Sequence, residues 1–280
     1  MNNKSMRKRQ VYHSDFWEEI AEDDNPFATK EAYCHGYNVY EDILQKATWF
    51  EYLYVMFKGE KPTKAQAALL EKLAIALANP GPREASVRAA MNGGVGGSTH
   101  AASLMAALAV GSGQYGGSHE VSLASQIWSK CGFSIDEWKS ILLAPNEDTR
   151  ADIWHPIEHA PGFDPNGISC PSITLAILNA LEDVQKGGAL SWLKENRVSL
   201  ESFLGYPLAI SGIAAAAFYD LELSDNQASM LYLILRLPGA AVHALEQETV
   251  PWTKFPFFGD AIELMDDPGS KGVPNLEELL

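Results

Sequence analysis

Apolar residues recur with the 3.6-residue period of an amphipathic helix along most of the chain. Between residues 64 and 78, for example, Leu69, Leu70, Leu73 and Leu77 fall on one stripe. The same period predicts helices at residues 38–45, 48–57, 120–130, 136–143, 172–186, 190–196, 208–221 and 225–248. No segment alternates apolar and polar residues convincingly, so the pattern predicts no β-strand and an all-α fold.

Capping and breaking residues indicate where several of these helices begin and end. Thr48 and Glu51 have the spacing of a capping box, in which each side chain satisfies a backbone donor of the other residue. Gly59 ends that helix, and Pro62-Thr63 opens the next one. The run Pro80-Gly81-Pro82 then breaks it.

A different pattern occupies residues 98–110, where nearly all side chains are small. A helix that is this small and apolar on all sides must be buried, in the core or at a subunit interface. The glycine-rich residues 111–117 that follow predict a loop whose backbone closely approaches another group. Residues 145–171 form a long loop rich in proline, glycine and histidine, and loops of this length are usually functional or disordered.

Composition narrows the class of protein. The formal charge of −15 argues against nucleic acid as a partner, and the basic run at residues 4–9 is interpreted as a solvated tail. The longest apolar stretch, residues 204–218, is too short to span a bilayer comfortably, so no membrane partner is expected. The start of the chain does not resemble a secretory signal. Three widely spaced cysteines suggest neither disulfides nor zinc, which predicts a cytoplasmic protein.

One group of metal-ligating residues falls in the long loop. Prolines at 156 and 161 argue against the regular helix that would bring its two histidines to one face. We therefore predict no metal at this group, which is made up of His155, Glu158, His159 and Asp164.

Four segments resemble, in order, the motifs of one protein family. Residues 35–42 are similar to the G-Y-x-I-x-D-L opening of citrate synthases and citryl-CoA lyases, and residues 50–63 to their F-E-x-x-x-Y-L-L-x-G-x-L-P-T motif. Residues 103–120, which end in Gln-Tyr-Gly-Gly-Ser-His-Glu, resemble the family's helix and H-G-G-A-N-E loop. Residues 236–246 resemble R-x-x-G-x-x-A-H-x-L-E. The matches span residues 35 to 250.

The resemblance implies an all-α, citrate synthase-like architecture. A large helical domain would comprise residues 1–126 and 222–280, with a smaller helical domain of residues 127–221 inserted in it. The active site would lie in the cleft between the two, in a homodimer. Closure of that cleft would exclude water from the reaction.

The resemblance also suggests catalytic residues, although the sequence departs from the family at each position. Tyr115 replaces the first histidine of the family, where the lyases have Phe, and it would polarise or orient the thioester. Ser211 aligns with the catalytic Asp and cannot act as a carboxylate base; it would position a water or a hydroxyl group. One alignment register keeps His159 as the ligand of the oxo-acid carbonyl, whereas another pairs residues 161–163 with the motif and leaves no histidine there.

Further residues are assigned to binding. Arg236 is retained and would pair with a substrate carboxylate, unless a buried acid is its partner. Arg88 aligns with a further histidine of the lyases, and His119 occupies the place of the family's Asn, for which a structural role is the alternative. The CoA part of the substrate would lie against three glycines of the loop, Gly113, Gly116 and Gly117.

Two hypotheses about function follow. The first is an enzyme that makes or breaks a C–C bond between an acyl-CoA and an oxo-acid, closer to citryl-CoA lyase than to citrate synthase, with the CoA thioester as its substrate. The second is a catalytically silent relative that binds a CoA ester or a partner for a regulatory purpose. The loss of the carboxylate at position 211 is the main support for the second.

Overall fold

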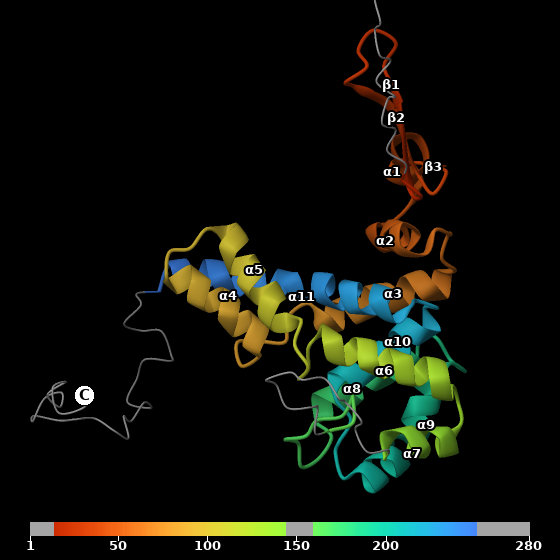
Figure 1. The fold of residues 1–280 in the computed structure, drawn as a ribbon, viewed down its shortest axis with the longest axis vertical. Coiled ribbons are helices and arrows are strands. Elements are labelled where there is room, and N and C mark those ends of the chain that lie inside the picture. Colours follow the sequence, from red (N-terminus) through yellow and green to blue (C-terminus); the bar gives the residue numbers. More distant parts are fainter. Residues whose placement is uncertain (1–13, 144–158, 251–280) are drawn as a thin grey trace, which may run out of the picture.

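The computed structural model describes residues 14–143 and 159–250 (Figure 1). A short π-helix, η1 (Val39–Ile43), leads directly into the first α-helix. The α-helices of the described residues are α1 (Leu44–Lys46), α2 (Trp49–Lys58), α3 (Lys64–Leu77), α4 (Ala85–Val95), α5 (His100–Gly111), α6 (Ser118–Cys131), α7 (Ile135–Leu142), α8 (Ser172–Glu182), α9 (Ala189–Leu204), α10 (Ile210–Asp220) and α11 (Asp225–Glu248). The predicted helical fold class is confirmed.

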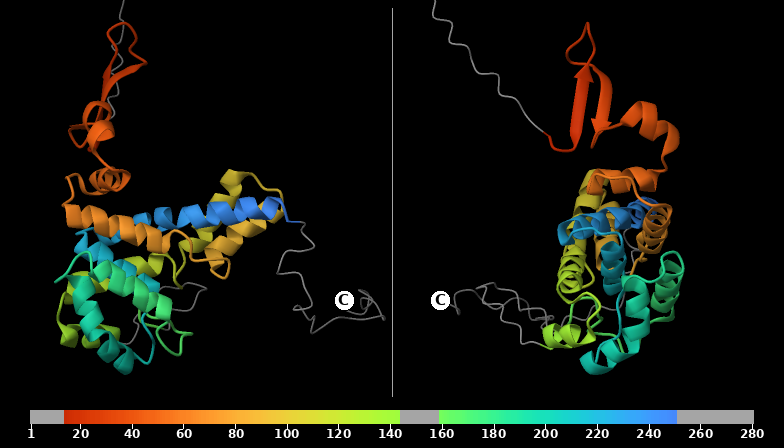
Figure 2. Two further views of the ribbon diagram at one scale, coloured as in Figure 1. Left: turned by 180° about the vertical axis from the view of Figure 1, so that it is seen from behind. Right: turned by 90° about the vertical axis from the view of Figure 1, so that its right-hand side faces the viewer.

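The prediction that the chain contains no strand is wrong. Strands β1 (Trp17–Ala21), β2 (Thr29–Cys34) and β3 (Tyr37–Asn38) form an antiparallel sheet in the order β1-β2-β3. Figures 1 and 2 show β1 and β2 standing away from the helical body. Because both faces of the sheet are largely exposed, with Ala32, Cys34 and Asn38 as its buried residues, the strands lack the apolar–polar alternation of a half-buried sheet.

The core of the molecule surrounds α10. Residues 211–218 of this helix are all buried, which its run of four alanines permits, since small side chains let neighbouring helices approach closely. Helices α3, α6 and α9 pack against α10. Tyr54 of α2 is buried beside it and donates a hydrogen bond to the Leu221 carbonyl at the end of α10. The predicted capping box of Thr48 and Glu51 is present at the start of α2.

Helices α4, α5 and α11 form a second, tightly packed layer. A Cβ atom at Gly93 would lie 2.4 Å from Ser103 Oγ of α5, and one at Gly94 would lie 2.2 Å from the Ala244 carbonyl oxygen of α11. Close approach of three helix backbones therefore requires glycine at both positions. The sequence analysis identified no helix at α4, because its glycines are typical of a loop.

The small-residue helix predicted at residues 98–110 is α5, and it is buried on one side only. Ser103, Ala107 and Gly111 face α4 and the core, whereas Met105 and Val110 are exposed. The expectation that this helix is buried on all sides is therefore wrong within a single chain. An interface with another subunit remains a prediction.

Helices α7, α8 and α9 gather at one end of the molecule, below α6 and α10 in Figure 1. An aromatic cluster fills the space between α6, α7, α9 and α10: Trp128, Phe133, Trp138, Trp192 and Tyr219. The inserted domain predicted for residues 127–221 includes these helices, but its first boundary falls inside α6. The division into two domains remains a prediction.

The longest helix, α11, has a break at Pro238. Proline has no amide hydrogen, and the next amide, that of Gly239, donates to the Ala78 carbonyl of α3 at 2.7 Å. A Cβ at Gly239 would lie 2.4 Å from that oxygen, so α3 and α11 touch through their backbones. By length and composition α11 would be able to span a membrane, with 44% of the apolar window buried. Its contacts with α3, α4, α5 and α6 equally account for an apolar composition.

Candidate functional site

The glycine-rich loop between α5 and α6 folds back on itself. A Cβ at Gly117 would lie 2.3 Å from the carbonyl oxygen of Gly113 and 2.8 Å from that of Gly111. Gly116 has φ = +68°, a left-handed conformation that favours glycine. Of the three glycines predicted to contact CoA, Gly116 is exposed, Gly113 is half-buried and Gly117 is buried. The geometry explains glycine at 116 and 117 without a ligand, and the contact of all three glycines with CoA remains a prediction.

A buried carboxylate, that of Glu120 in the first turn of α6, connects this loop to two distant segments. Its Oε2 accepts a hydrogen bond from the Gly116 amide at 2.5 Å. Its Oε1 accepts one from the Gly162 amide at 2.9 Å and one from the Ser211 hydroxyl at 2.7 Å. Glu120 is only 2% exposed, so it is a buried hub that joins the start of α6, residues 159–164 and the start of α10.

Glu120 is ionised in this environment. Burial raises the pKa of its carboxyl group, but the nearby imidazole of His159 and hydrogen bonds from the Gly116 amide, the Ser211 hydroxyl and the Gly162 amide together lower the pKa below its ordinary value. A carboxylate that accepts several hydrogen bonds and has a low pKa is a weak proton acceptor. Glu120 therefore organises the site and is poorly suited to replace the family's base.

The segment that carries His159 is fixed against α10. The Ala209 amide donates to the Gly162 carbonyl at 3.0 Å, and Phe163 pairs with Leu208 in an isolated antiparallel bridge. A Cβ at Gly212 would lie 2.4 Å from the Gly162 carbonyl oxygen, so the two glycines allow direct contact between backbones. Phe163 is buried in the core, which leaves His159 as the residue of this segment that faces the hub.

His159 lies directly beneath Tyr115. The two rings stack with centroids 5.4 Å apart and an angle of 22° between their planes. Tyr115 is exposed, whereas His159 is buried, and within the described residues neither ring nitrogen has a hydrogen-bond partner. His159 Nε2 is 3.7 Å from Glu120 Oε2, which is beyond hydrogen-bond distance. A buried imidazole with two unsatisfied nitrogens is an unusual feature that calls for a ligand or a functional role.

Arg236 of α11 reaches the same loop from the other side. Its Nη1 donates to the Gly116 carbonyl at 2.8 Å, and the Tyr232 hydroxyl donates to the same oxygen at 3.0 Å. The guanidinium group also lies over the Tyr232 ring, 4.8 Å from its centroid. Gly116 is thus held at its amide by Glu120 and at its carbonyl by Arg236. Tyr115, the residue before Gly116, stacks on His159, so the three predicted residues lie on or next to this loop, and their roles remain predictions.

The anionic partner of Arg236 in the structure is Glu84. Arg236 Nη2 is 2.7 Å from Glu84 Oε1. The other oxygen, Oε2, caps α4 by accepting hydrogen bonds from the Ser86 amide at 2.9 Å, the Val87 amide at 3.1 Å and the Ser86 hydroxyl. Burial raises the pKa of Glu84, but the guanidinium group of Arg236 and these donors lower it below its ordinary value. Of the two alternatives for Arg236, the structure contains the buried acid.

Of the remaining predicted residues, Ser211 contacts the hub directly, whereas His119 and Arg88 are described by their own surroundings. Ser211 is buried and its hydroxyl is committed to Glu120, so a role in positioning water would use only its lone pairs. His119 follows Ser118 in α6 and is half-buried. Arg88, one turn into α4 from Glu84, donates to the Arg83 carbonyl at 3.1 Å. Substrate binding by His119 and Arg88 remains a prediction.

The group of residues for which no metal was predicted is only partly described. His155 and Glu158 lie outside the described residues, so the structure does not test their arrangement. Within residues 14–143 and 159–250, no three His, Cys, Asp or Glu side chains form a group suited to a metal ion. The three cysteines are unpaired.

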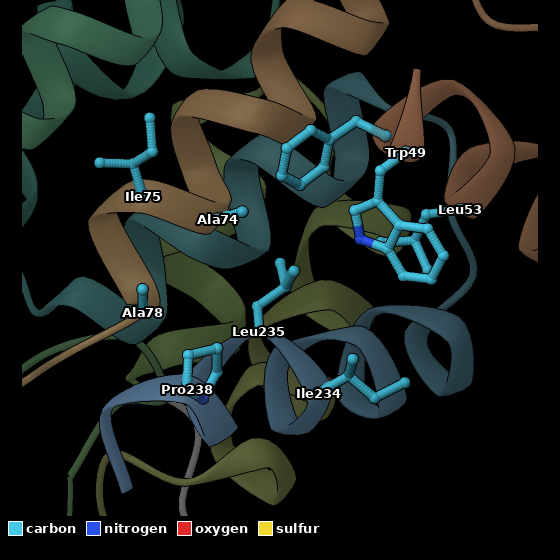
Figure 3. Close-up of a pocket in the computed structure, with 9 residues that line it drawn as sticks. Trp49, Leu53, Ala74, Ile75, Ala78, Ile234, Leu235 and Pro238 are labelled. Carbon is cyan, nitrogen blue, oxygen red and sulfur yellow. The ribbon is translucent and has the colours of Figure 1, made fainter. Parts of the chain in front are cut away.

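An apolar hollow of about 380 Å³ lies on the opposite side of α11 from Arg236 (Figure 3). Ile234 and Pro238, each two positions from Arg236, line it, which at 100° per residue places it on the opposite helix face. Its other walls come from α2, α3 and α11: Trp49, Phe50, Leu53, Ala74, Ile75, Ala78 and Leu235. This hollow is therefore separate from the polar site.

Solved structures match this arrangement of helices. The citryl-CoA lyase of Hydrogenobacter thermophilus matches with a TM-score of 0.70 at 18% identity, over 96% of this chain and 99% of that one. The chain therefore has the fold of the citrate synthase and citryl-CoA lyase superfamily. No protein-family model matches the sequence, and no curated protein does.

Two further structures share the citrate synthase fold with this chain. The ATP citrate lyase of Methanothrix soehngenii, in complex with citrate and coenzyme A, has a TM-score of 0.67 at 15% identity, over 98% of this chain and 44% of its own. A ternary complex of the citrate synthase of Thermoplasma acidophilum with carboxymethyl coenzyme A and oxaloacetate has a TM-score of 0.53 at 15% identity, over 83% of this chain and 60% of its own.

Two residues of the polar site were not predicted from the sequence. Glu120 is the last residue of the loop motif, but the motif assigns it no role. Its position in the first turn of a helix after a glycine loop was the available signal. Glu84 was not considered, because the helix that it caps was not predicted.

Proposed function

We propose that the protein acts on a CoA thioester and makes or breaks a C–C bond between an acyl-CoA and an oxo-acid, in the manner of a citryl-CoA lyase. The observation that carries the proposal is the environment of His159. It is buried, its two ring nitrogens lack partners among the described residues, and the exposed Tyr115 ring covers it. A carbonyl or hydroxyl oxygen of a substrate would satisfy one of these nitrogens.

The similar structures support the choice of substrate class. One is a citryl-CoA lyase, and two others contain coenzyme A or its carboxymethyl derivative together with an organic acid. In this chain the corresponding polar site is built from the α5–α6 loop, residues 159–164 and α11. We place the thioester beside Tyr115 and the glycine loop, and the oxo group beside His159.

In the cleavage direction, His159 would accept the proton of the hydroxyl group on the carbon that becomes the oxo carbon. The O–H electron pair forms the new C=O bond, and the electrons of the breaking C–C bond move onto the thioester as an enolate. The Tyr115 hydroxyl would donate a hydrogen bond to the enolate oxygen. A water molecule then gives a proton to the enolate carbon, which forms the acyl-CoA, and the resulting hydroxide takes the proton from His159.

The second candidate is a silent CoA-ester binder, and a specific observation favours it. Ser211 occupies the position of the family's carboxylate base, and the carboxylate beside it, Glu120, is ionised and hydrogen-bonded on both oxygens. Enolisation in the synthase direction needs a carboxylate base that these residues do not provide. The cleavage direction depends less on this base, so we favour a lyase over a synthase.

One set of assays distinguishes the candidates. The protein is incubated with citryl-CoA, or with a 3-hydroxyacyl-CoA that has one carboxylate fewer, and the oxo-acid released by C–C cleavage is measured, because the thioester is conserved and no free thiol appears. We expect release of an oxo-acid only when protein is present, and its loss in His159→Ala. The matched control His243→Ala removes a histidine of α11 that is paired with Asn79 and Glu246, and should retain the activity.

Binding measurements decide the remaining cases. No turnover together with a thermal shift in coenzyme A or acetyl-CoA would support the silent binder. If none of these compounds shifts the melting temperature, both candidates are excluded. We further propose a cytoplasmic homodimer without a resident metal.

A further inference from the structure

The pairing of Glu84 with Arg236 bears on which oxo compound the site accepts. Arg236 is 7% exposed, and the Glu84 side chain, 23% exposed, is the more accessible of the two. One oxygen of Glu84 is bound to the guanidinium group at 2.7 Å, in the position that a substrate carboxylate would take. The positive charge that such a ligand would need is therefore already neutralised within the protein.

The other contacts of the pair make it a fixed arrangement. Glu84 is held by the first-turn amides of α4, and Arg236 is held by the Gly116 carbonyl and the Tyr232 ring. An incoming carboxylate would have to displace Glu84 from Arg236 or approach within reach of its negative charge. Juxtaposed like charges at such a site are a common means of rejecting a ligand.

We infer that Glu84 is a specificity-determining residue, which replaces a substrate carboxylate on Arg236 so that the site favours an oxo compound without a carboxylate at that end. The acceptor is then less acidic than oxaloacetate, with at most one carboxylate, bound away from Arg236. Arg236 serves mainly to hold the Gly116 peptide. This inference rests on the proposed function for the location of the site.

The test measures oxaloacetate binding by calorimetry, in the presence of saturating coenzyme A, to the full-length protein and to Glu84→Gln. Glutamine removes the charge and keeps an oxygen for the α4 cap. We expect Glu84→Gln to bind oxaloacetate at least about tenfold more tightly, because a repulsive charge is removed and Arg236 is freed. The affinity for dimethyl oxaloacetate, which has the same oxo group and no charge, should change less than about twofold between the two proteins.

Two further variants make the result decisive. Glu84→Ser keeps a preferred helix N-cap without a carboxylate and should show the same gain in affinity for oxaloacetate. It serves as a second variant in case Glu84→Gln does not fold. Glu71→Gln removes an exposed carboxylate of α3 and should bind both compounds like the unmodified protein. The inference is overturned if neither Glu84 variant binds oxaloacetate more tightly, or if both compounds gain equally.

The readout does not depend on turnover. If the protein fails to act on any CoA ester but the charge-specific gain appears, the proposed function falls and the inference about Glu84 stands. If turnover occurs and the gain is missing, the inference alone falls.

Discussion

At the scale of single residues, the site depends on two carboxylates that the protein keeps charged. Glu120 and Glu84 are both withdrawn from water, and in each case hydrogen bonds or a cation outweigh the effect of burial on the pKa. Glu120 holds the amide side of the Gly116 peptide, and Glu84 orients the arginine that holds its carbonyl side. Both therefore fix the position of the loop.

We expect Glu120→Gln to lower the free energy of unfolding at pH 7 by about 1–3 kcal/mol, because one buried donor loses its acceptor. The pKa of Glu120 in the folded protein lies below its ordinary value of 4.5. Its stabilisation is therefore present above pH 4.5 and is lost as the pH falls through the lower, folded-state pKa. Urea denaturation at pH 7 and at successively lower pH should show that the difference in the free energy of unfolding between the unmodified protein and Glu120→Gln becomes smaller.

The exposed Glu71→Gln variant serves as the control, and its stability should follow that of the unmodified protein at each pH. A difference for Glu120→Gln that stays constant down to pH 3.5 would mean that folding does not lower the pKa of Glu120.

At the scale of elements, sequence patterns predicted those helices that bury one continuous apolar face. The range predicted for the last helix, residues 225–248, agrees with α11 at both ends, and α6 and α7 agree to within two residues. Such helices are recognisable because the spacing of their apolar residues follows directly from which face of the helix is buried. The predicted helix at 190–196 was too short, since α9 continues to Leu204, with Leu200 buried and Phe203 and Leu204 packed against the core.

Elements whose stability comes from other sources could not be predicted in this way. Helix α4 ends in Gly93 and Gly94, which disfavour a helix locally and are required by contacts with α5 and α11. The β1–β2 hairpin buries too little of either face to produce an alternating pattern. In the site, the convergence of Tyr115, His159 and Arg236 followed from motif order alone. The hydrogen bonds around these residues join segments that are far apart in the sequence, so no local sequence pattern predicts them.

The α5–α6 loop gives a prediction at this scale. Gly117→Ala should lower the free energy of unfolding by about 1–3 kcal/mol, because its Cβ would overlap the Gly113 and Gly111 carbonyl oxygens. The displaced loop should also reduce the thermal shift caused by coenzyme A.

Gly113→Ala is the matched control for this loop. Its Cβ would approach only the Val110 carbonyl oxygen, at 3.3 Å, so we expect a cost below about 1 kcal/mol. Equal stabilities of the two variants would show that the backward fold of the loop is not required.

At the scale of the whole molecule, the site is assembled from segments far apart in the sequence. The cap of α4, the loop before α6, residues 159–164 and the middle of α11 meet at one peptide, that of Gly116. The outer faces of α5 and α11, which belong to the same layer, remain apolar and exposed. Large apolar surfaces of this kind usually mark an interaction with another protein or a membrane.

The large apolar residues exposed on α11 lie on one stripe, with the exposed Pro238 between its two halves: Met230, Ile234, Val242 and Leu245. We expect this stripe and the outer face of α5 to meet the same faces of a second copy in a two-fold dimer. Light scattering after gel filtration, without detergent, should give twice the chain mass of 30.6 kDa. Val242→Glu should shift the mass toward one chain, because it places a charge in the apolar contact.

The control is Val198→Glu on α9, a valine equally exposed at 63% but at the other end of the molecule, and it should remain dimeric. A monomer at micromolar concentrations, or a Val242→Glu variant of unchanged mass, would exclude this interface. Aggregation that only detergent relieves would instead assign the stripe to a membrane, since α11 meets the length and composition of a spanning helix. A two-chain mass that Val242→Glu lowers would account for both the apolar stripe of α11 and the exposed side of α5, since the two faces would be buried together.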